Sequence, residues 1–424
     1  MMLNQVWLRM INRFKELWEF KIFKYTVVIQ VGYFILSLII TLIFFRDMND
    51  FLVYYKVGQQ VLTDMNELYT TTYNWPFRYL PISALYFVPF YLMGFDLGFV
   101  VFNSINFMLN ILIGIILYKI VMLVRRKGHE KGDKRVILYI CLYMLSLPQL
   151  FNYILGQINL YLTLLILLSL YIFLKKSEIK WDLIASLILG ISLLIKPITI
   201  FLIPFLIVLH FDFQNRKLTF NLTKSFIRLI GLVLPLSLNF ILFLIYPNLL
   251  EGFIGANFTS SEPSQINHSF SLTKLIINFL YFIQFTDSQI LSIQIPLFLT
   301  LLLIISILGF ISFTTRNNNN TSLIYGYSFG ILIMFLCYFD SWDHHLLNFT
   351  PLLIIILFNL PRESNLNKKF FKPSFYFLSF LDLAFMGIFF ITKNFFPFNF
   401  ASTIFLLLTF YGLIKYNTVT NNKQ

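Results

Sequence analysis

Two carboxylates, Asp47 and Asp50, follow directly on a long apolar run that ends near residue 45. An aspartate that is partly desolvated beside cations can act as a general base, because its environment raises its affinity for a proton. Aspartate is also favoured as the N-cap of a helix, so either residue could instead cap the helix that follows. The sequence therefore offers Asp50 as a base, with Asp47 as the second choice and capping as the alternative.

Two cations, Lys196 and Arg78, stand close to apolar segments on either side of them. A lysine at membrane depth is costly unless it pairs or faces a wet cavity, which makes Lys196 a functional candidate. Arginine binds phosphate through its planar fork of donors. We expect both to bind a phosphate group, with side chains that reach toward the membrane surface as the alternative.

Amides, histidines and further acidic residues occupy three other breaks between apolar runs. A turn, a solvated loop or an interfacial cap would also explain each of them. Adjacent residues of a helix point about 100° apart, so neighbouring His and Asp side chains do not face a common centre, and we expect no metal site. The expected roles are phosphate binding for His345 and His344, and substrate binding for Tyr54, Gln157, Asn159, Asn267, His268 and Asp343.

Long apolar segments must position these residues. Hydrophobic residues make up 58% of the 424-residue chain and charged residues 12%. A helix of about 20 apolar residues crosses a bilayer, so the runs 26–45, 97–123 and 290–313 indicate an all-α polytopic membrane protein. The segment 81–93 is short and contains two prolines, and we expect it to form interfacial helices in the first external loop.

The distribution of cations predicts the orientation, because cytoplasmic loops are enriched in Lys and Arg. A model with about 12 spans and both termini inside leaves all but six of the 32 Lys and Arg residues cytoplasmic. We expect an amphipathic helix over 1–24 on the inner surface, one transmembrane catalytic domain over 25–415 and a cytoplasmic tail over 416–424. The net charge of +13 reflects this topology and attraction to anionic lipid, and no nucleic-acid motif accompanies it.

The candidate residues all fall on the predicted external side. A transporter would place polar groups near the middle of the membrane and often repeats one half of the fold in the other. One-sided clustering is typical of an enzyme that acts on a lipid-linked substrate at the outer face of a cell membrane. A flippase for lipid-linked sugars is the alternative.

An ordered set of short motifs resembles glycosyltransferase family 87, which has the GT-C type of fold. The resemblance covers roughly residues 46–350. Two departures are His268, where the family tends to have glutamine, and Leu80, where a second proline is common. The motifs are Asp50-Phe51-Leu52-Val53-Tyr54-Tyr55, Phe77-Arg78-Tyr79-Leu80-Pro81, Gly156-Gln157-Ile158-Asn159, Ile195-Lys196-Pro197, Asn267-His268-Ser269 and Ser341-Trp342-Asp343-His344-His345.

The resemblance implies an inverting sugar transfer, most often of mannose, from a polyprenyl phosphate carrier to a glycolipid or glycan acceptor. It implies that Asp50 is the catalytic base. The leaving group is a phosphate monoester that needs charge stabilisation more than a proton. We therefore expect no cofactor and no divalent metal. A GT-C enzyme with another sugar or phosphosugar donor fits the same residues.

Overall fold

The computed structural model describes residues 14–424 with several gaps. The described part leaves out 1–13, 71–72, 74, 126–133, 213–214, 260–268, 316–321, 340, 393–395 and 422–424. Most of the predicted N-terminal amphipathic helix, together with Asn267 and His268, therefore lies outside the described residues.

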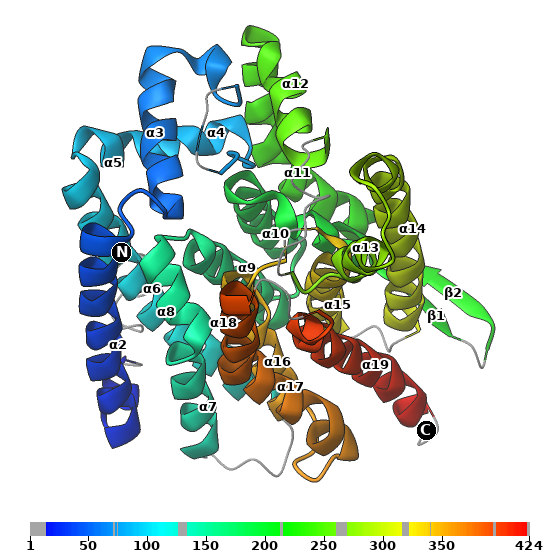
Figure 1. Cartoon of the computed structure of the whole chain (residues 1–424). Helices are drawn as coiled ribbons and strands as arrows, with labels where there is room; N and C mark the ends of the chain where they lie inside the picture. The colour runs from blue at the N-terminus through cyan, green and yellow to red at the C-terminus, as the bar shows by residue number, and fades with distance from the viewer. Residues whose placement is uncertain are drawn as a thin grey trace.

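The chain is built from helices, with one short hairpin (Figure 1). The elements are α2 (Lys21–Ile39), η1 (Ile40–Phe44), α3 (Asp50–Thr63), η2 (Met65–Glu67), α4 (Pro81–Ala84), η3 (Leu85–Phe87), α5 (Val88–Leu92), α6 (Phe95–Val124), α7 (Lys134–Met144), α8 (Leu147–Leu155), α9 (Asn159–Lys175), α10 (Ile179–Ile195), η4 (Pro197–Leu206), β1 (Leu209–Asp212), β2 (Lys217–Phe220), α11 (Leu222–Ile245), α12 (Asn248–Ile254), η5 (Gly255–Thr259), α13 (Leu272–Phe282), α14 (Asp287–Thr314), α15 (Ser322–Cys337), η7 (Asp343–Asn348), α16 (Thr350–Asn359), η8 (Asn367–Phe371), α17 (Lys372–Tyr376), η9 (Phe377–Leu381), α18 (Asp382–Thr392), η10 (Phe398–Phe400) and α19 (Ala401–Asn421).

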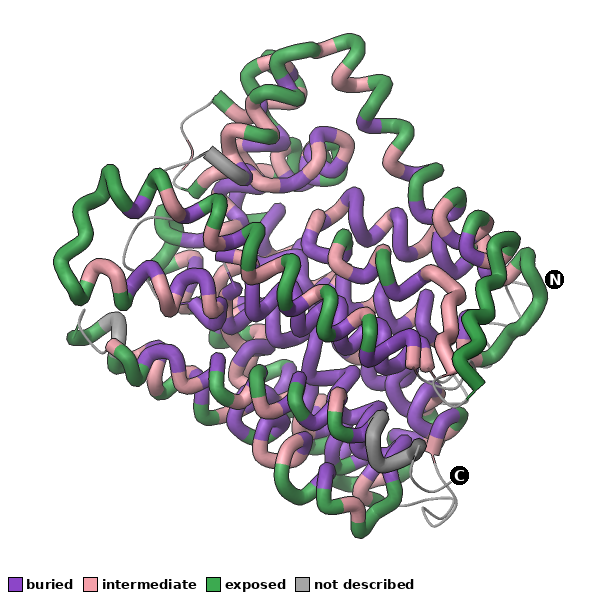
Figure 2. The backbone as a smooth tube through the Cα atoms, turned by 90° about the vertical axis from the view of Figure 1, so that its right-hand side faces the viewer, coloured by how far each residue is buried: buried purple, intermediate pink, exposed green. Residues whose placement is uncertain are grey.

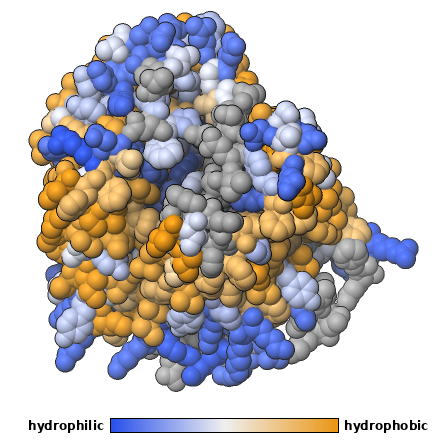
Figure 3. Space-filling view, in the orientation of Figure 1, coloured by the Kyte–Doolittle hydropathy of each residue, from blue (hydrophilic) through white to orange (hydrophobic). Residues whose placement is uncertain are grey.

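Six helical segments in the described part are long and apolar enough to cross a membrane. They are Lys21–Phe44, Phe95–Val124, Lys134–Leu155, Leu222–Ile245, Asp287–Thr314 and Phe398–Tyr416. A band of apolar surface separates hydrophilic surface at the top from hydrophilic surface at the bottom (Figure 3). The all-α, multi-pass membrane architecture is confirmed at this level, whereas the count of about 12 spans stays a prediction.

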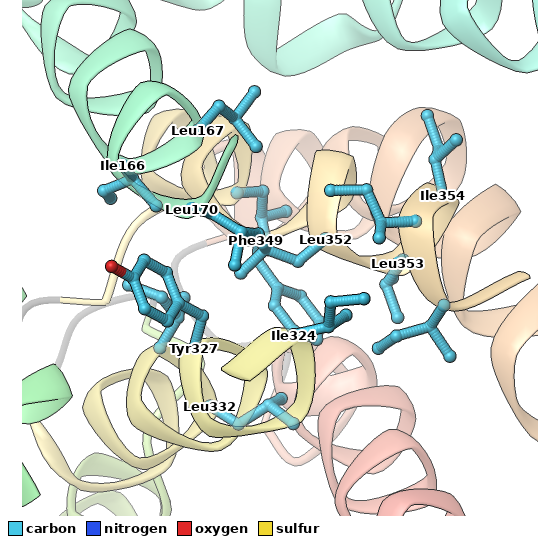
Figure 4. Packing of buried hydrophobic residues seen from close by; sticks show 14 of the residues in the cluster. Ile166, Leu167, Leu170, Ile324, Tyr327, Leu332, Phe349, Leu352, Leu353 and Ile354 are labelled. Carbon is cyan, nitrogen blue, oxygen red and sulfur yellow. The ribbon is translucent and has the colours of Figure 1, made fainter. Parts of the chain in front are cut away.

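The core is formed where α6, α9, α15 and α16 pack against one another. Buried residues gather in the centre of the molecule (Figure 2), and leucine and isoleucine side chains from α9, α15 and α16 meet there (Figure 4). All of α16 is buried, and so is almost all of α15. A helix that is apolar on every side is typical of the interior of a membrane protein.

The connection between the first two long helices folds into short helices, as predicted, whereas their location at the membrane interface stays a prediction. The predicted helix over 81–93 is present as α4, η3 and α5. Here α3 lies so close that a Cβ on Gly58 would stand 2.6 Å from the carbonyl oxygen of Phe87. Phe51 packs its ring against Phe90 and Phe99, at 6.3 and 5.4 Å between ring centroids. This aromatic cluster fixes the start of α3 on α5 and α6.

Helices α10 and α11 pack side by side along most of their lengths. Added Cβ atoms on Gly190 and Gly231 would lie 2.4 Å and 2.6 Å from backbone oxygens of the facing helix, so glycine permits this close contact. The guanidinium of Arg228 contacts the Asp182 carboxylate at 2.7 Å, and both side chains are buried. The ion pair joins the two helices at the end of α10 opposite Lys196.

The hairpin of β1 and β2 is a departure from the all-helical prediction. It follows η4, a run of 3-10 helix that begins at Pro197 and contains Pro204. Proline cannot donate a backbone hydrogen bond within a helix, which explains why this apolar run does not continue as a regular α-helix.

We predict that Asp182→Ala destabilises the protein by about 3–5 kcal/mol, because it leaves the buried Arg228 guanidinium without its carboxylate. Thermal unfolding in detergent, followed by circular dichroism, measures the change. The double variant Asp182→Leu/Arg228→Met should recover most of the loss. The control Glu178→Ala removes an exposed carboxylate that pairs with Lys180 and should leave the transition unchanged. An unchanged transition for Asp182→Ala would contradict the prediction.

Candidate active site

Asp50 is the first residue of α3, but it is not the cap of this helix. The side chain of Asn49 accepts a hydrogen bond from the backbone N–H of Leu52 at 2.9 Å, which is the N-cap contact. The capping interpretation of Asp50 is therefore wrong. Asp47 is exposed in the preceding turn, whereas Asp50 is partly buried and points into a polar cluster.

Gln157 connects Asp50 to the rest of this cluster. Its Nε2 donates a hydrogen bond to Oδ2 of Asp50 at 2.5 Å, and its Oε1 accepts one from the hydroxyl of Tyr54 at 3.1 Å. Asn159 lies 3.5 Å from the same Oε1 and accepts a hydrogen bond of 3.0 Å from the Nζ of Lys196. Asp50, Tyr54, Gln157, Asn159 and Lys196 thus form one connected group.

The burial of this group changes the acidity of its charged members. Burial raises the pKa of Asp50, while the hydrogen bond from Gln157 and the positive charge of Lys196 oppose that rise. Burial lowers the pKa of Lys196 to about 7, against the attraction of Asp50. A carboxylate with a raised pKa titrates closer to neutrality, which suits proton transfer. The lowered pKa of Lys196 means that this residue can bind an anion only while it carries its proton.

Tyr79 and Arg78 form the wall of the site beside Lys196. The Nζ of Lys196 lies 5.7 Å from the centroid of the Tyr79 ring, and the hydroxyl groups of Tyr79 and Tyr54 are 2.7 Å apart. Arg78 is close enough for its charge to affect both Tyr79 and His345. The structure therefore brings Arg78 and Lys196 to the same place from segments 118 positions apart in the sequence.

The two histidines of η7 are buried near the same cations. Burial and the charge of Lys196 lower the pKa of His344 to about 3, which Asp343 only partly offsets. The pKa of His345 is also lowered, by burial and then by Lys196, His344 and Arg78. Both rings are therefore neutral near pH 7. They can donate one hydrogen bond to a phosphate oxygen but add no positive charge.

Hydrogen bonds to α9 fix the position of η7. Asn348 donates to the backbone oxygen of His345 at 3.1 Å and accepts from the hydroxyl of Thr163 at 3.0 Å. The Nδ1 of His345 lies 3.3 Å from the backbone N–H of Trp342, so Nδ1 accepts this hydrogen bond. The ring proton of His345 is then on Nε2, the nitrogen that remains to donate to a ligand.

The turn that carries Gln157 depends on Gly156. This residue has a φ of +64°, and an added Cβ would lie 2.7 Å from the Cβ of Phe51. Asn106 and Asn152 donate to the backbone oxygen of Gln157 at 3.2 and 3.1 Å. Gly156 lets the turn approach the start of α3, and the two amides hold it there.

Asn106 belongs to a group of buried amides that our sequence analysis missed. Asn103, Asn106 and Asn110 lie on one face of α6, at the i, i+3, i+7 spacing that places residues on one side of a helix. Asn110 donates to Gln30 of α2 at 2.9 Å and accepts from Gln149 of α8 at 3.2 Å. Three amides on one face of a predicted span were the signal that could have found them.

Asp343 contacts a different part of the protein from its neighbouring histidines. It lines a narrow pocket with Phe151, Leu378 and Asp382, and its carboxyl interacts with that of Asp382. Asp382 in turn accepts a hydrogen bond from Ser402. Within the described part of the chain, no three His, Cys, Asp or Glu residues are grouped in a way that could hold a metal ion.

A hydrophilic hollow opens above the apolar belt in the orientation of Figure 1 (Figure 3). In that orientation, the lower end of α3 lies above the level of α8 and α9 (Figure 1). Several site residues come from the ends of these helices: Asp50 from α3, Asn159 from α9 and Lys196 from the end of α10. The polar site thus lies near one surface of the apolar belt.

Comparison with known proteins identifies the family. The model of glycosyltransferase family 87 matches residues 77–338, and no curated protein matches the chain. The match includes Arg78, Gln157, Asn159 and Lys196 but not Asp50 or the two histidines, which the fold adds to the site. Because the match covers more than half of the sequence, the chain belongs to glycosyltransferase family 87.

Proposed function

We propose that this glycosyltransferase moves a sugar from a polyprenyl phosphate carrier to a glycolipid or glycan acceptor, and that the sugar is mannose. The reaction takes place on the outer face of the cell membrane, with both termini in the cytoplasm, and inverts the anomeric carbon. The observation that supports this proposal best is the connection from Asp50 through Gln157 and Asn159 to Lys196. This connection holds the proposed base, Asp50, and the proposed phosphate-binding cation, Lys196, in fixed relation to each other at one surface of the apolar belt.

In the proposed reaction, Asp50 removes the proton from the acceptor hydroxyl as the oxygen attacks the anomeric carbon. The bond from that carbon to the phosphate oxygen breaks, and the polyprenyl phosphate leaves with the electron pair. Lys196 and Arg78 stabilise the negative charge of the phosphate, and His345 donates a hydrogen bond to it. Tyr54, Gln157 and Asn159 orient the base and the sugar, and no divalent ion is required.

The activity is tested with purified protein in vesicles, radiolabelled polyprenyl phosphate mannose and a lipid extract of the host, in the presence of EDTA. We expect labelled product with inverted anomeric configuration. We also expect that only donor supplied to the outer face is used. Movement of donor across the bilayer without transfer would support a flippase instead. Transfer from a polyprenyl phosphate glucose donor only would assign another sugar. Inhibition by EDTA that Mn²⁺ or Mg²⁺ reverses would contradict metal independence.

Asp50→Asn should lower turnover by about 10²- to 10⁴-fold, the usual effect of losing a positioned base, because the amide keeps the shape but cannot accept the proton. Initial rates of sugar transfer at saturating donor measure the effect. Asp47→Asn is the matched control: Asp47 is exposed and should be dispensable. An inactive Asp47→Asn beside an active Asp50→Asn would move the base to Asp47.

Lys196→Ala should weaken donor binding by about 10- to 100-fold, the range expected for losing a hydrogen bond to a charged group. The apparent KM for the donor should rise more than the KM for the acceptor. Arg46→Ala is the control, since it removes an exposed cation that pairs with Asp96 in the same part of the chain. An unchanged donor KM for Lys196→Ala would contradict donor binding by this lysine and indicate a structural role.

The pH dependence of kcat/KM should be bell-shaped. Activity falls on the acidic side as Asp50 gains a proton, at a pH above that of an ordinary aspartate because its pKa is raised. It falls on the alkaline side as Lys196 loses its proton, near pH 7 in the free enzyme.

Two variants test this assignment of the limbs. Lys196→Arg should abolish the alkaline limb, because the guanidinium keeps its charge. Gln157→Leu should move the acidic limb to higher pH, because the charged form of Asp50 loses a hydrogen bond. Limbs that do not move in either variant would contradict the assignment.

A further inference from the structure

The β1–β2 hairpin has one apolar face and one polar face. Antiparallel pairing places Leu209 opposite Phe220 and Phe211 opposite Leu218, so these four side chains share a face. The other face carries two pairs, His210 with Thr219 and Asp212 with Lys217. An isolated two-stranded hairpin is marginally stable in water, so a hairpin of this kind needs a surface that covers its apolar face.

Two sets of hydrogen bonds hold the hairpin against the bundle. The Nδ1 of His210, on the polar face, lies 3.1 Å from the backbone oxygen of Thr314 at the end of α14. At the base, the backbone N–H of Val208 donates to Ser225 at 2.9 Å, and that of Asn221 donates to Val208 at 3.0 Å. The polar face therefore contacts α14, and the hairpin is joined to the first turn of α11.

The apolar face leads into the surface of a candidate span. Leu218 and Phe220 are 59% and 52% exposed, and Leu222 and Phe226 at the start of α11 are 66% and 61% exposed. The same stripe continues along α11 to Leu244, and little of this span is buried inside the protein. Exposed apolar residues along a span face lipid, so lipid is the environment that adjoins the exposed face of the hairpin. In Figure 1 the hairpin extends sideways from the bundle beside the lower part of α14.

The charges of the hairpin and the adjoining turn indicate which lipids cover it. Arg216 and Lys217 are exposed at the tip, and Lys224 follows in the first turn of α11, against the single carboxylate of Asp212 between residues 209 and 224. The backbone N–H and side-chain amide of Asn215 donate to Asp212 at 3.2 and 2.7 Å, so this carboxylate is engaged within the turn. The excess cations suit phosphate headgroups.

We propose that the hairpin is a lipid-binding anchor that lies in the membrane interface and recognises anionic lipid. Leu218 and Phe220 enter the boundary between headgroups and acyl chains, while Arg216, Lys217 and Lys224 contact the anionic headgroups. This anchor lies at the end of the bundle opposite Lys196, because Asp182 and Arg228 join the starts of α10 and α11 there. It is therefore separate from the catalytic site and does not depend on the proposed reaction.

The test uses full-length protein in phosphatidylcholine vesicles with and without anionic phosphatidylglycerol. A nitroxide label is attached to Phe220→Cys or, as a matched control on the opposite face, to Thr219→Cys. The parent protein, whose Cys141 and Cys337 are both buried, gives the background. Collision with oxygen reports lipid contact, and collision with a water-soluble nickel complex reports water contact.

We expect oxygen to dominate at 220 and nickel to dominate at 219. In anionic vesicles, the triple variant Arg216→Gln/Lys217→Gln/Lys224→Gln should move the probe at 220 toward water. The ratio of oxygen collisions to nickel collisions at 220 should fall by about five-fold for each cation removed. Lys175→Gln/Lys176→Gln/Lys180→Gln removes three cations elsewhere at the same end and should leave the probe unchanged.

Three results would overturn the proposal. Equal accessibility at 219 and 220 would show a solvated hairpin. A depth that is the same in neutral and anionic vesicles, and insensitive to the triple variant, would remove the headgroup recognition. Spin–spin broadening at 220 between copies would show that a second copy of the chain, and not lipid, covers this face.

Discussion

The geometry of the candidate active site depends on the hydrogen bonds of one residue, Gln157. Its side chain holds Asp50 and Tyr54, and through Asn159 it is connected to Lys196. Its backbone oxygen is held by Asn106 and Asn152. An amide is suited to this position because it both donates and accepts, and it remains neutral beside a carboxylate and an ammonium group. A charged residue at position 157 would attract one of the two charged groups, the Asp50 carboxylate or the Lys196 ammonium, and repel the other.

The membrane environment explains why so many amides accompany this residue. A polar group that lacks a hydrogen bond in a low-dielectric interior costs several kcal/mol, so buried polar residues must satisfy one another. The connection of Gln30, Asn110 and Gln149 joins α2, α6 and α8 below the site. Aromatic packing of Phe51 on α5 and α6 holds the other side of Asp50. Asp50 is thus positioned by a polar network on one side and by apolar contacts on the other.

Burial also determines which basic residues of the site could contribute positive charge to the proposed binding of phosphate. Arginine keeps its charge in any such environment, whereas Lys196 has a lowered pKa, and the two histidines are neutral. The sequence suggested that the histidines stabilise phosphate charge. Their surroundings limit them to hydrogen bonds, and the positive charge comes from Arg78 and Lys196.

The sequence by itself determined the all-α membrane architecture and the helical segment over 81–93, and it singled out Asp50, Gln157 and Lys196, which the structure brings into one hydrogen-bonded group. The length of an apolar run, and the presence of a polar residue within or beside it, are local features of the chain. Both can therefore be identified from the sequence alone. Only the tertiary structure decided that Asn49 and not Asp50 caps α3, that Asn106 of α6 and Asn152 of α8 hold the Gln157 turn, and that Asp343 turns toward Asp382. It also decided that η4 leads into a hairpin. The cap of α3 is a local contact between Asn49 and Leu52, but both Asn and Asp are favoured at an N-cap, so the sequence pattern does not separate Asn49 from Asp50. The contacts of Gln157 and Asp343 join segments far apart in the chain, and no local pattern specifies which distant partner satisfies a buried polar group.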